Sequence, residues 1–524
     1  MNKSIFISGL LLTLALGSCY KDKGNYGYKD VNDFEVTVTP APADKETNIY
    51  LVNQPGATTE TFLLTAEGKQ TLNNSEENLE YIWYRTLNVE DKKVSSDTIT
   101  GKENLMELPA TKKSKWQVLL VVRDKSLDIE HYSNITVKTK VPFTNSWLFV
   151  HGAAGERKIG CLSWDVAGKA EITPDIQDAM GRPGYPNMTG ITYSAGGAQD
   201  YILMERLFIT SSPDSITYIF PFDCKKMGDY REMNVPANVH VREVITPNVN
   251  STSYVAMIST EGKYYYSTSW GTPMFEQPQG DVSSDYSIDL AYMDSRGDVT
   301  LWDDTHKRLM NCIGGTIGYM GTVDANALAG KKALWLGRDA KTTSAGDREP
   351  CLFIAKNEHN NKCYLYHISY DDKGDKMAKG DDSKGDGGEG FAYGNVTCDS
   401  THTWGFDEST LFAVSDYYQD QFFFTKDNVV YRGIMASGES IELYELEGTI
   451  KKIAFRYANQ SVVEDFNANQ HILALVVTNT EGHDEIHEIH LNNGGDVEKV
   501  EKYALGDITI IDWEFTALNR LTDY

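Results

Sequence analysis

Cysteine, positive charge and long apolar runs are all scarce in this chain. Only 7 cysteines occur among 524 residues, which is few for an exported protein, so disulfide bonds are not its main support. Lys and Arg number 49 against 75 Asp and Glu, which gives a net charge of −26. Such a chain is repelled by phosphate backbones and anionic lipid headgroups, which argues against nucleic acid and against polybasic docking to a membrane.

The well-known catalytic signatures are also absent from the sequence. It contains no GxSxG in a strand–turn–helix context, no HExxH, no P-loop and no Gly-rich dinucleotide turn. No CxxC pair or Cys/His cluster has zinc spacing. We therefore expect no catalytic residue, no metal and no cofactor. Cys351 and Cys363 are expected on neighbouring strands and are a candidate disulfide pair.

Three polar segments have the composition of a site but are better interpreted as structural. Asp303 to His306 places two carboxylates beside a histidine, but polar turn residues between strands explain it better. His487 and His490 belong to an alternation with period two, which puts them on opposite faces of a strand and not at one metal. Asp371 to Gly390 is acidic and Gly-rich but lacks the EF-hand order, so we expect an exposed loop there.

What the sequence does contain begins with a short apolar leader. Lys3 precedes the apolar run Ile5 to Leu16, which is too short to span a bilayer permanently. The following Leu16-Gly17-Ser18-Cys19 resembles a bacterial lipobox, in which the cysteine is lipidated and becomes the mature N-terminus. We therefore expect a signal peptide at 1–18 and a polar, flexible tether at 19–33. An ordinary secretory signal with an accidental cysteine is the alternative.

The segment CYKDKGNYGYKDVNDFEV, which starts at Cys19, is similar to the opening of the PKD-like lipoproteins of Bacteroidetes. Lys21-Asp22-Lys23 matches in part the signal that sends such lipoproteins to the outer surface. The resemblance implies a lipid-anchored protein of the outer membrane that faces the cell exterior. It also implies two partners from Sus-like nutrient uptake, a TonB-dependent transporter and its companion lipoprotein.

Residues 34–141 carry alternating apolar positions at the spacing of a β-sandwich. YIWYR, with Trp83, and KWQVLLVVRDKS followed by SNITVKT resemble an immunoglobulin-like PKD domain, although its usual Gly-Asp-Gly turn is missing. We expect Trp83 and Trp116 in the core and not as ligand platforms.

Residues 142–524 contain a repeat that indicates a β-propeller. Apolar segments recur about every fifty residues, and each is followed by further strands. Asp507 to Phe515 lacks following strands and Ser146 to Trp164 lacks a preceding one, so together they complete one blade. We expect an all-β chain with seven blades, although six or eight remain open. The inner strands are expected to begin near Met188, His240, Tyr286, Lys332, Thr401, Lys451 and Asp507.

Propeller ligands usually bind at loops that enter inner strands and at loops between second and third strands. On this basis Arg182, Tyr185, Tyr417 and Tyr418 are the candidate ligand-binding residues. Exposed tyrosines would stack on a glycan or an extended peptide, whereas the alternative is that they only fill the loops.

Two functions fit these sequence features. The first is a non-catalytic surface lipoprotein that captures a glycan or peptide nutrient for the importer, or in a minor variant only docks to it. The second is a surface glycoside hydrolase or lyase, which would need paired carboxylates about 5 to 10 Å apart at the propeller mouth.

Overall fold

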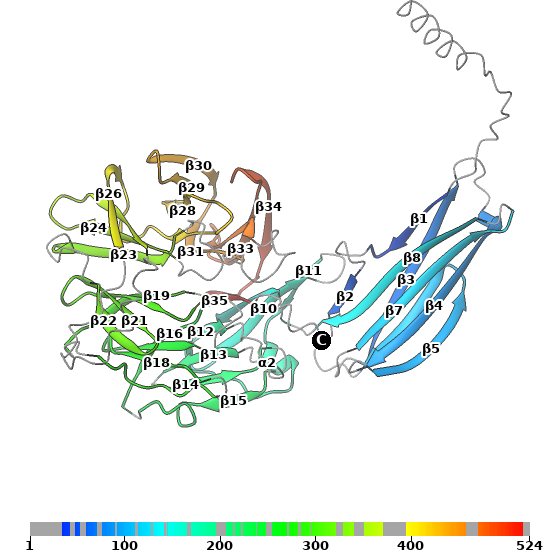
Figure 1. The fold of residues 1–524 in the computed structure, drawn as a ribbon, viewed down its shortest axis with the longest axis horizontal. Coiled ribbons are helices and arrows are strands. Elements are labelled where there is room, and N and C mark those ends of the chain that lie inside the picture. The colour runs from blue at the N-terminus through cyan, green and yellow to red at the C-terminus, as the bar shows by residue number, and fades with distance from the viewer. Residues whose placement is uncertain are drawn as a thin grey trace, which may run out of the picture.

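The computed structural model describes residues 34–516 except for 42–47, 53–58, 71–75, 90–91, 110–113, 127–128, 141–142, 144, 165–168, 195–205, 213–214, 222–223, 237, 248–253, 270–271, 281–284, 295, 321–327, 340–349, 370–394 and 457–469. Cys19, the tether and the Asp371 to Gly390 loop therefore lie outside the described residues. Strands dominate the described chain, as expected for an all-β protein. Strands β1 to β8 form one body and the strands from β9 onward form another (Figure 1). No helix within the described ranges is long and apolar enough to cross a membrane.

The N-terminal body consists of two facing sheets. One has the order β1-β3-β6 and the other β2-β8-β7-β4-β5. Their strands are β1 (Phe34–Thr39), β2 (Asn48–Val52), β3 (Thr59–Gln70), β4 (Leu79–Val89), β5 (Lys92–Thr100), β6 (Glu103–Pro109), β7 (Ser114–Asp124) and β8 (Ile129–Lys140), with a 3-10 turn at Glu76–Asn78.

Alternation with period two decides which side chains enter the core of this body. Every second residue of β6 is buried, because successive side chains of a strand point to opposite faces. Trp83 is fully buried and Trp116 is 5% exposed, so their predicted place in the core is confirmed. Their indole N–H groups donate to the carbonyls of Gly101 and Glu107, which satisfies the polar atoms of both buried rings.

The second body is β-propeller-like and contains seven consecutive antiparallel sheets among the described residues. In sequence order, the first sheet has strands β35 (Ile510–Thr516), β9 (Ser146–His151), β10 (Lys158–Trp164) and β11 (Ala170–Thr173). The second and third have β12 (Met188–Ser194), β13 (Arg206–Ser211), β14 (Ser215–Ile219), β15 (Lys226–Asp229), and then β16 (Val241–Ile245), β17 (Val255–Ser259), β18 (Tyr264–Ser267).

The remaining four sheets follow the same order along the chain. The fourth has β19 (Ile288–Met293), β20 (Val299–Asp303), β21 (Arg308–Ile313), β22 (Thr316–Tyr319), and the fifth has β23 (Lys331–Arg338), β24 (Cys351–Asn357), β25 (Cys363–Ser369), β26 (Asn395–Trp404). The sixth has β27 (Phe412–Ala413), β28 (Gln421–Lys426), β29 (Val429–Ile434), β30 (Glu439–Glu445), and the seventh has β31 (Thr449–Phe455), β32 (Ile472–Thr478), β33 (Asp484–Leu491), β34 (Val497–Ala504).

A recurring bulge marks the first strand of these sheets. In six of the seven described sheets the pairing of the first strand with the second shifts by one residue near its beginning. A bulge bends a strand and increases its twist, which suits a strand at the crowded inner end of a sheet.

The last described strand joins the first sheet. β35 pairs with β9 along its whole length, from Ile510 opposite His151 to Thr516 opposite Ser146. The predicted combination of Asp507 to Phe515 with Ser146 to Trp164 in one sheet is therefore confirmed.

One expectation about the strands is wrong, and the candidate disulfide is excluded. The segment at Thr401 lies in β26, the fourth strand of its sheet, and the first strand of the next sheet is the two-residue β27. Cys351 and Cys363 lie on neighbouring strands, but Cys351 pairs with Ile368 and Cys363 with Lys356. The two cysteines therefore sit at opposite ends of the strand pair, on the order of 15 Å apart at about 3.4 Å per residue, too far for a disulfide.

Candidate ligand-binding site

Arg182 and Tyr185 lie where the sequence placed them, just before a first strand. They follow the short helix α2 (Ile176–Ala179) and precede β12. Arg182 is exposed, whereas Tyr185 is half-buried against the core between the first two sheets. Burial raises the pKa of the Tyr185 hydroxyl. The carbonyl of the next residue, Pro186, accepts from Gly155 and Arg157 in the loop between the second and third strands of the first sheet.

Tyr417 and Tyr418 lie between the first and second strands of their sheet, not between the second and third as predicted. Tyr418 is only 1% exposed. Its hydroxyl donates to the carbonyl of Asn492 at 2.9 Å and lies 2.7 Å from Nδ1 of His471. Burial raises the pKa of Tyr418 and lowers the pKa of His471. Tyr418 is thus a core residue that ties two sheets together, and its predicted role as a stacking platform is wrong.

The structure does not bring the predicted ligand residues together. Tyr185 precedes a first strand and lies beside a loop between second and third strands. Tyr417 follows a first strand, its ring centroid is 3.9 Å from that of His471, and its neighbour Tyr418 contacts a loop between third and fourth strands. These two kinds of loop lie at opposite ends of the strands, so Tyr185 and Tyr417 cannot share one ligand.

The Asp303 cluster is a closed structural network. Asp303 is fully buried and accepts hydrogen bonds from the backbone N–H groups of Ser287 and Thr305 and from Nε of Arg308 at 2.8 Å. Nδ1 of His306 also lies 2.8 Å from Oδ2 of Asp303. Because its oxygens are already occupied, Asp303 holds the turn and the ends of two strands in place, in keeping with the turn interpretation.

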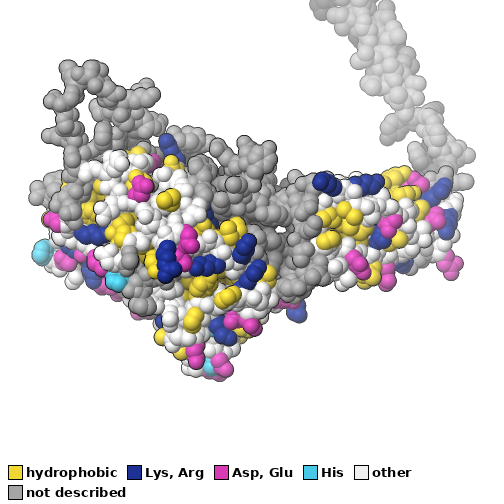
Figure 2. Space-filling view, turned by 90° about the horizontal axis from the view of Figure 1, so that it is seen from below, with side chains coloured by type: hydrophobic (Ala, Val, Ile, Leu, Met, Phe, Trp, Pro, Cys, Tyr) yellow, Lys and Arg dark blue, Asp and Glu magenta, His cyan; other side chains and the backbone are white. Residues whose placement is uncertain are grey.

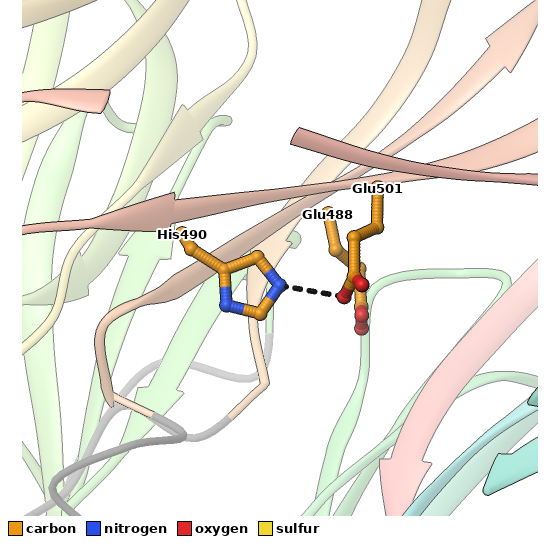
Figure 3. Close-up of side chains that lie close together, drawn as sticks. All are labelled: Glu488, His490 and Glu501. Carbon is orange, nitrogen blue, oxygen red and sulfur yellow. Dashed lines mark hydrogen bonds and ion pairs between the residues drawn. The ribbon is translucent and has the colours of Figure 1, made fainter. Parts of the chain in front are cut away.

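Glu488, His490 and Glu501 form a cluster that was not predicted from the sequence (Figure 3). Their ligand atoms lie within 4.8 Å of one another, on β33 and β34. Glu488 and His490 share one face of β33, and Glu488 is paired with Glu501 on the neighbouring strand. The alternation Glu-x-His was visible in the sequence, but the pairing that adds Glu501 was not.

The neighbours of this cluster make it a poor metal site. Arg456 donates to both carboxylate oxygens of the fully buried Glu488, at 2.6 and 2.5 Å, and the indole of Trp147 donates at 2.8 Å. Burial by itself raises the pKa of Glu501, but hydrogen bonds from Lys499, Tyr503 and His490 outweigh it and leave that pKa below its ordinary value. A cation would compete with the Arg456 guanidinium, so the cluster is a structural ion network between the seventh and first sheets.

A carboxylate pair lies on the first strand β35. Asp512 and Glu514 are two residues apart and share a face, so their Cα atoms are on the order of 7 Å apart. Asp512 accepts from the backbone N–H of Ile191 at 3.0 Å and pairs with Lys452 at 2.9 Å. Burial, followed by the charge of Asp512, raises the pKa of Glu514 to about 8. Glu514 is thus stabilised as the neutral acid, whereas Asp512 is held by an ion pair and a backbone hydrogen bond.

The outer face of the five-stranded N-terminal sheet contains an open groove of about 490 Å³. It crosses β5, β4, β7 and β8, whose register places side chains in rows. One row consists of Thr98, Tyr84, Leu119 and Asn134, and the next of Ser96, Thr86, Gln117 and Thr136. The groove is therefore lined by hydroxyl and amide groups around one aromatic ring.

The ionisable pair among the lining residues, Arg85 and Asp97, projects from the opposite face of the sheet, because Arg85 lies between the outward-facing Tyr84 and Thr86 of β4. Arg85 donates from Nε and one terminal nitrogen to Asp97 at 2.5 and 2.8 Å. Its other terminal nitrogen donates to Asn104 Oδ1 at 2.9 Å and to the Leu105 carbonyl at 2.6 Å. The hydrogen bond from Arg85 is the main cause that lowers the pKa of Asp97. The groove thus offers neutral polar chemistry and one exposed ring.

The outward-facing residues of each strand are the sequence feature from which this face could have been predicted. In YIWYR the burial of Trp83 implies that Tyr84 points outward, and 47% of Tyr84 is exposed. The outward-facing residues of β7 and β8 could be predicted from the same alternation. What could not be read was that their strands lie side by side and form a concave surface.

On the face shown in Figure 2, basic and acidic side chains are interspersed over the described surface, with no broad region of one charge.

Comparisons with known proteins agree with a PKD-like domain at the N-terminus. Residues 19–182, less than half of the chain, match the PKD-like family. No curated protein matches the chain. A quinoprotein alcohol dehydrogenase-like protein of Bacteroides thetaiotaomicron is 12% identical, with a TM-score of 0.39 and coverage of 92% of this chain and 99% of that one. The WD40 domain of Toxoplasma gondii coronin is 11% identical, with a TM-score of 0.39 over 68% of this chain and 81% of its own. These scores are too low to indicate a shared function.

Proposed function

We propose that this chain, whose residues 19–182 match the PKD-like family, is a lipoprotein of the outer membrane that faces the cell exterior. It captures a glycan or peptide nutrient without chemistry and passes it to a TonB-dependent transporter and its companion lipoprotein. Cys19 carries the lipid anchor. Acyl chains attached to it contribute about 0.8 kcal/mol of membrane-binding free energy per buried CH₂, so several chains hold the protein firmly in the membrane.

The observation that carries the proposal is the open groove on the N-terminal sheet. It combines a pocket of about 490 Å³ with hydroxyl and amide groups and an exposed Tyr84, which is the chemistry of a binding site. Asp97, the one acidic residue of the lining, points to the other face of the sheet and is held by Arg85, so no carboxylate is available in the groove. A surface of this kind retains a ligand and leaves it unchanged.

We propose that the second body, from β9 onward, is a closed propeller of seven blades. Support comes from polar contacts that connect each sheet, or the loop entering it, to the next in a complete circuit. They are Asp512 to Ile191, Thr246 to Tyr193, Arg242 to Ile288, Thr300 to Cys351, Lys332 to Glu408, Ser415 to Gln470 and Asp484 to Ile510. Closure leaves only the short outer edges of the blades unpaired, which limits edge-to-edge aggregation.

A second candidate function is glycoside hydrolysis at Asp512 and Glu514. Such enzymes use an acid that is kept neutral beside a second carboxylate, and Glu514 and Asp512 share one face of β35. The ion pair of Asp512 with Lys452 and its bond to Ile191 favour a structural role, so we rank this function second.

The test uses the full chain purified from outer membranes in mild detergent. Affinity purification should recover a TonB-dependent transporter with it, and calorimetry should detect a bound glycan or peptide that mass spectrometry finds intact after long incubation. Recovery of cleaved product that disappears in Glu514→Gln would support the hydrolase instead. Absence of both a transporter and any bound nutrient would contradict the proposed function.

A further inference from the structure

We propose that the groove on the N-terminal sheet binds a neutral oligosaccharide laid across β5, β4, β7 and β8. This inference rests on the proposed function, which leaves glycan and peptide open, and it names one of them. It also moves the binding site from the propeller-like body to the PKD-like domain.

The direction of the groove disfavours a peptide. Peptides that bind sheets usually add a strand along an exposed edge, where unpaired backbone groups supply the hydrogen bonds. Here β4 and β7 are each paired on both sides, and the groove lies over their face. It crosses four strands about 4.8 Å apart, a span of about 14 Å, and offers side chains but no backbone ladder.

The polar groups of the groove suit sugar hydroxyls. Thr86 and Ser96 hydroxyls bond each other at 3.0 Å, and Gln117 Oε1 accepts from Asn88 at 3.2 Å. The amide hydrogens of Gln117 remain available, and among the described residues the side chains of Asn134 and Thr136 have no protein partner. Hydroxyls and amides donate and accept at once, as a sugar hydroxyl does.

Tyr84 supplies the apolar component. Its ring is 47% exposed and stands between Thr98 on β5 and Leu119 on β7 in the same row. A flat aromatic face next to hydroxyl and amide groups is the common arrangement for holding the C–H face of a sugar ring while its hydroxyls are bonded.

The charges of the groove indicate a neutral glycan and not an acidic one. Arg85, the one cation among the lining residues, turns its side chain to the opposite face of the sheet, where it binds Asp97, Asn104 and the Leu105 carbonyl. The chain as a whole carries −26. A uronic acid polymer would find no available cation among the lining residues and would be repelled by that net charge.

The experiment measures binding of the detergent-purified full chain by calorimetry to oligomers of glucose, mannose, xylose and galactose, to oligogalacturonate, and to tryptic casein peptides. At least one neutral oligomer should bind, and Tyr84→Ala or Asn134→Ala should weaken it about tenfold or more, because each 1.4 kcal/mol is a factor of ten. Tyr84→Phe should retain most of the affinity. Tyr132→Ala is the matched control, since it removes a ring that is 58% exposed on the same sheet face but outside the groove lining.

Melting curves of all variants verify that each is folded. A neutral oligomer that Tyr84→Ala binds as tightly as the wild type, or a clear preference for peptides or oligogalacturonate, overturns the inference. If the affinity is lost instead in Tyr185→Ala, nutrient capture stands but the groove is not the site. If none of the probes binds, the proposed function itself fails.

Discussion

The indole of Trp147 stacks on the indole of Trp513, with ring centroids 4.1 Å apart and planes 12° from parallel. Trp147 lies at the start of the second body and Trp513 in the final strand, β35. Thr516 adds a hydroxyl that donates to the carbonyls of Phe143 and Ser146. The two ends of this body thus meet in one sheet.

Removing this stack should destabilise the whole second body. Trp513→Ala leaves a cavity beside Trp147 and should lower the free energy of unfolding by about 3 to 5 kcal/mol. Tyr132→Ala, at an exposed position, should change it by no more than about 0.5 kcal/mol. Denaturant melts monitored by tryptophan fluorescence measure both. A chain shortened at residue 506 that still melts cooperatively at the wild-type temperature would contradict closure by β35.

Removing only the cation of the Arg456–Glu488 ion pair should lower the stability of the fold strongly. Arg456→Met leaves a fully buried carboxylate without its cation, and loss of about 3 to 5 kcal/mol of stability is expected. Adding Glu488→Gln should restore part of the loss, because the buried charge is then gone. The control is Lys332→Ala, whose ion pair with Glu408 is exposed and worth less than about 1 kcal/mol. Equal effects of Arg456→Met and Lys332→Ala would show that Glu488 is solvated.

Stability should fall as the pH rises because of Glu514. Burial raises its pKa in the folded protein to about 8 from the ordinary 4.5, so the folded state binds the proton more tightly than the unfolded state. The contribution is fully present below about pH 4.5 and is lost as the pH rises through about 8. Melting temperatures between these pH values should decline less in Glu514→Gln than in the wild type. Parallel curves for the two proteins would rule out a raised pKa.

Cys19→Ala tests the anchor separately from the fold. Without the thiol no acyl chain can be attached, so the variant should leave the membrane fraction or remain unprocessed. Fractionation followed by mass spectrometry of the N-terminus distinguishes these outcomes. Added protease should digest the wild type on intact cells, and complete protection there would contradict display on the exterior.

Local pattern was sufficient for much of the fold. Period-two alternation placed Trp83 and Trp116 in the core, and the recurring apolar segments located six of the seven first strands. The seventh failed because β27 has two residues, too few for any periodicity, while β26 before it runs for ten residues and ends on a tryptophan.

The ligand residues were less predictable, because their burial depends on partners distant in sequence. Tyr418 looks like an exposed loop residue until His471 and Asn492, 53 and 74 residues away, cover it. Likewise Gln117 and Asn134 are ordinary outward residues until register aligns them beside Tyr84. Pairing between strands, and not composition, creates the groove.

Hydroxyl-radical footprinting of the full chain, with and without the neutral oligosaccharide that binds most tightly, shows directly whether the groove holds the ligand. Protection is expected at Tyr84 and in the segments 96–98, 117–119 and 134–136, with no change at Arg182, Tyr185 or Tyr417. Protection at Tyr185 or Tyr417 with an unchanged Tyr84 would contradict binding in the groove.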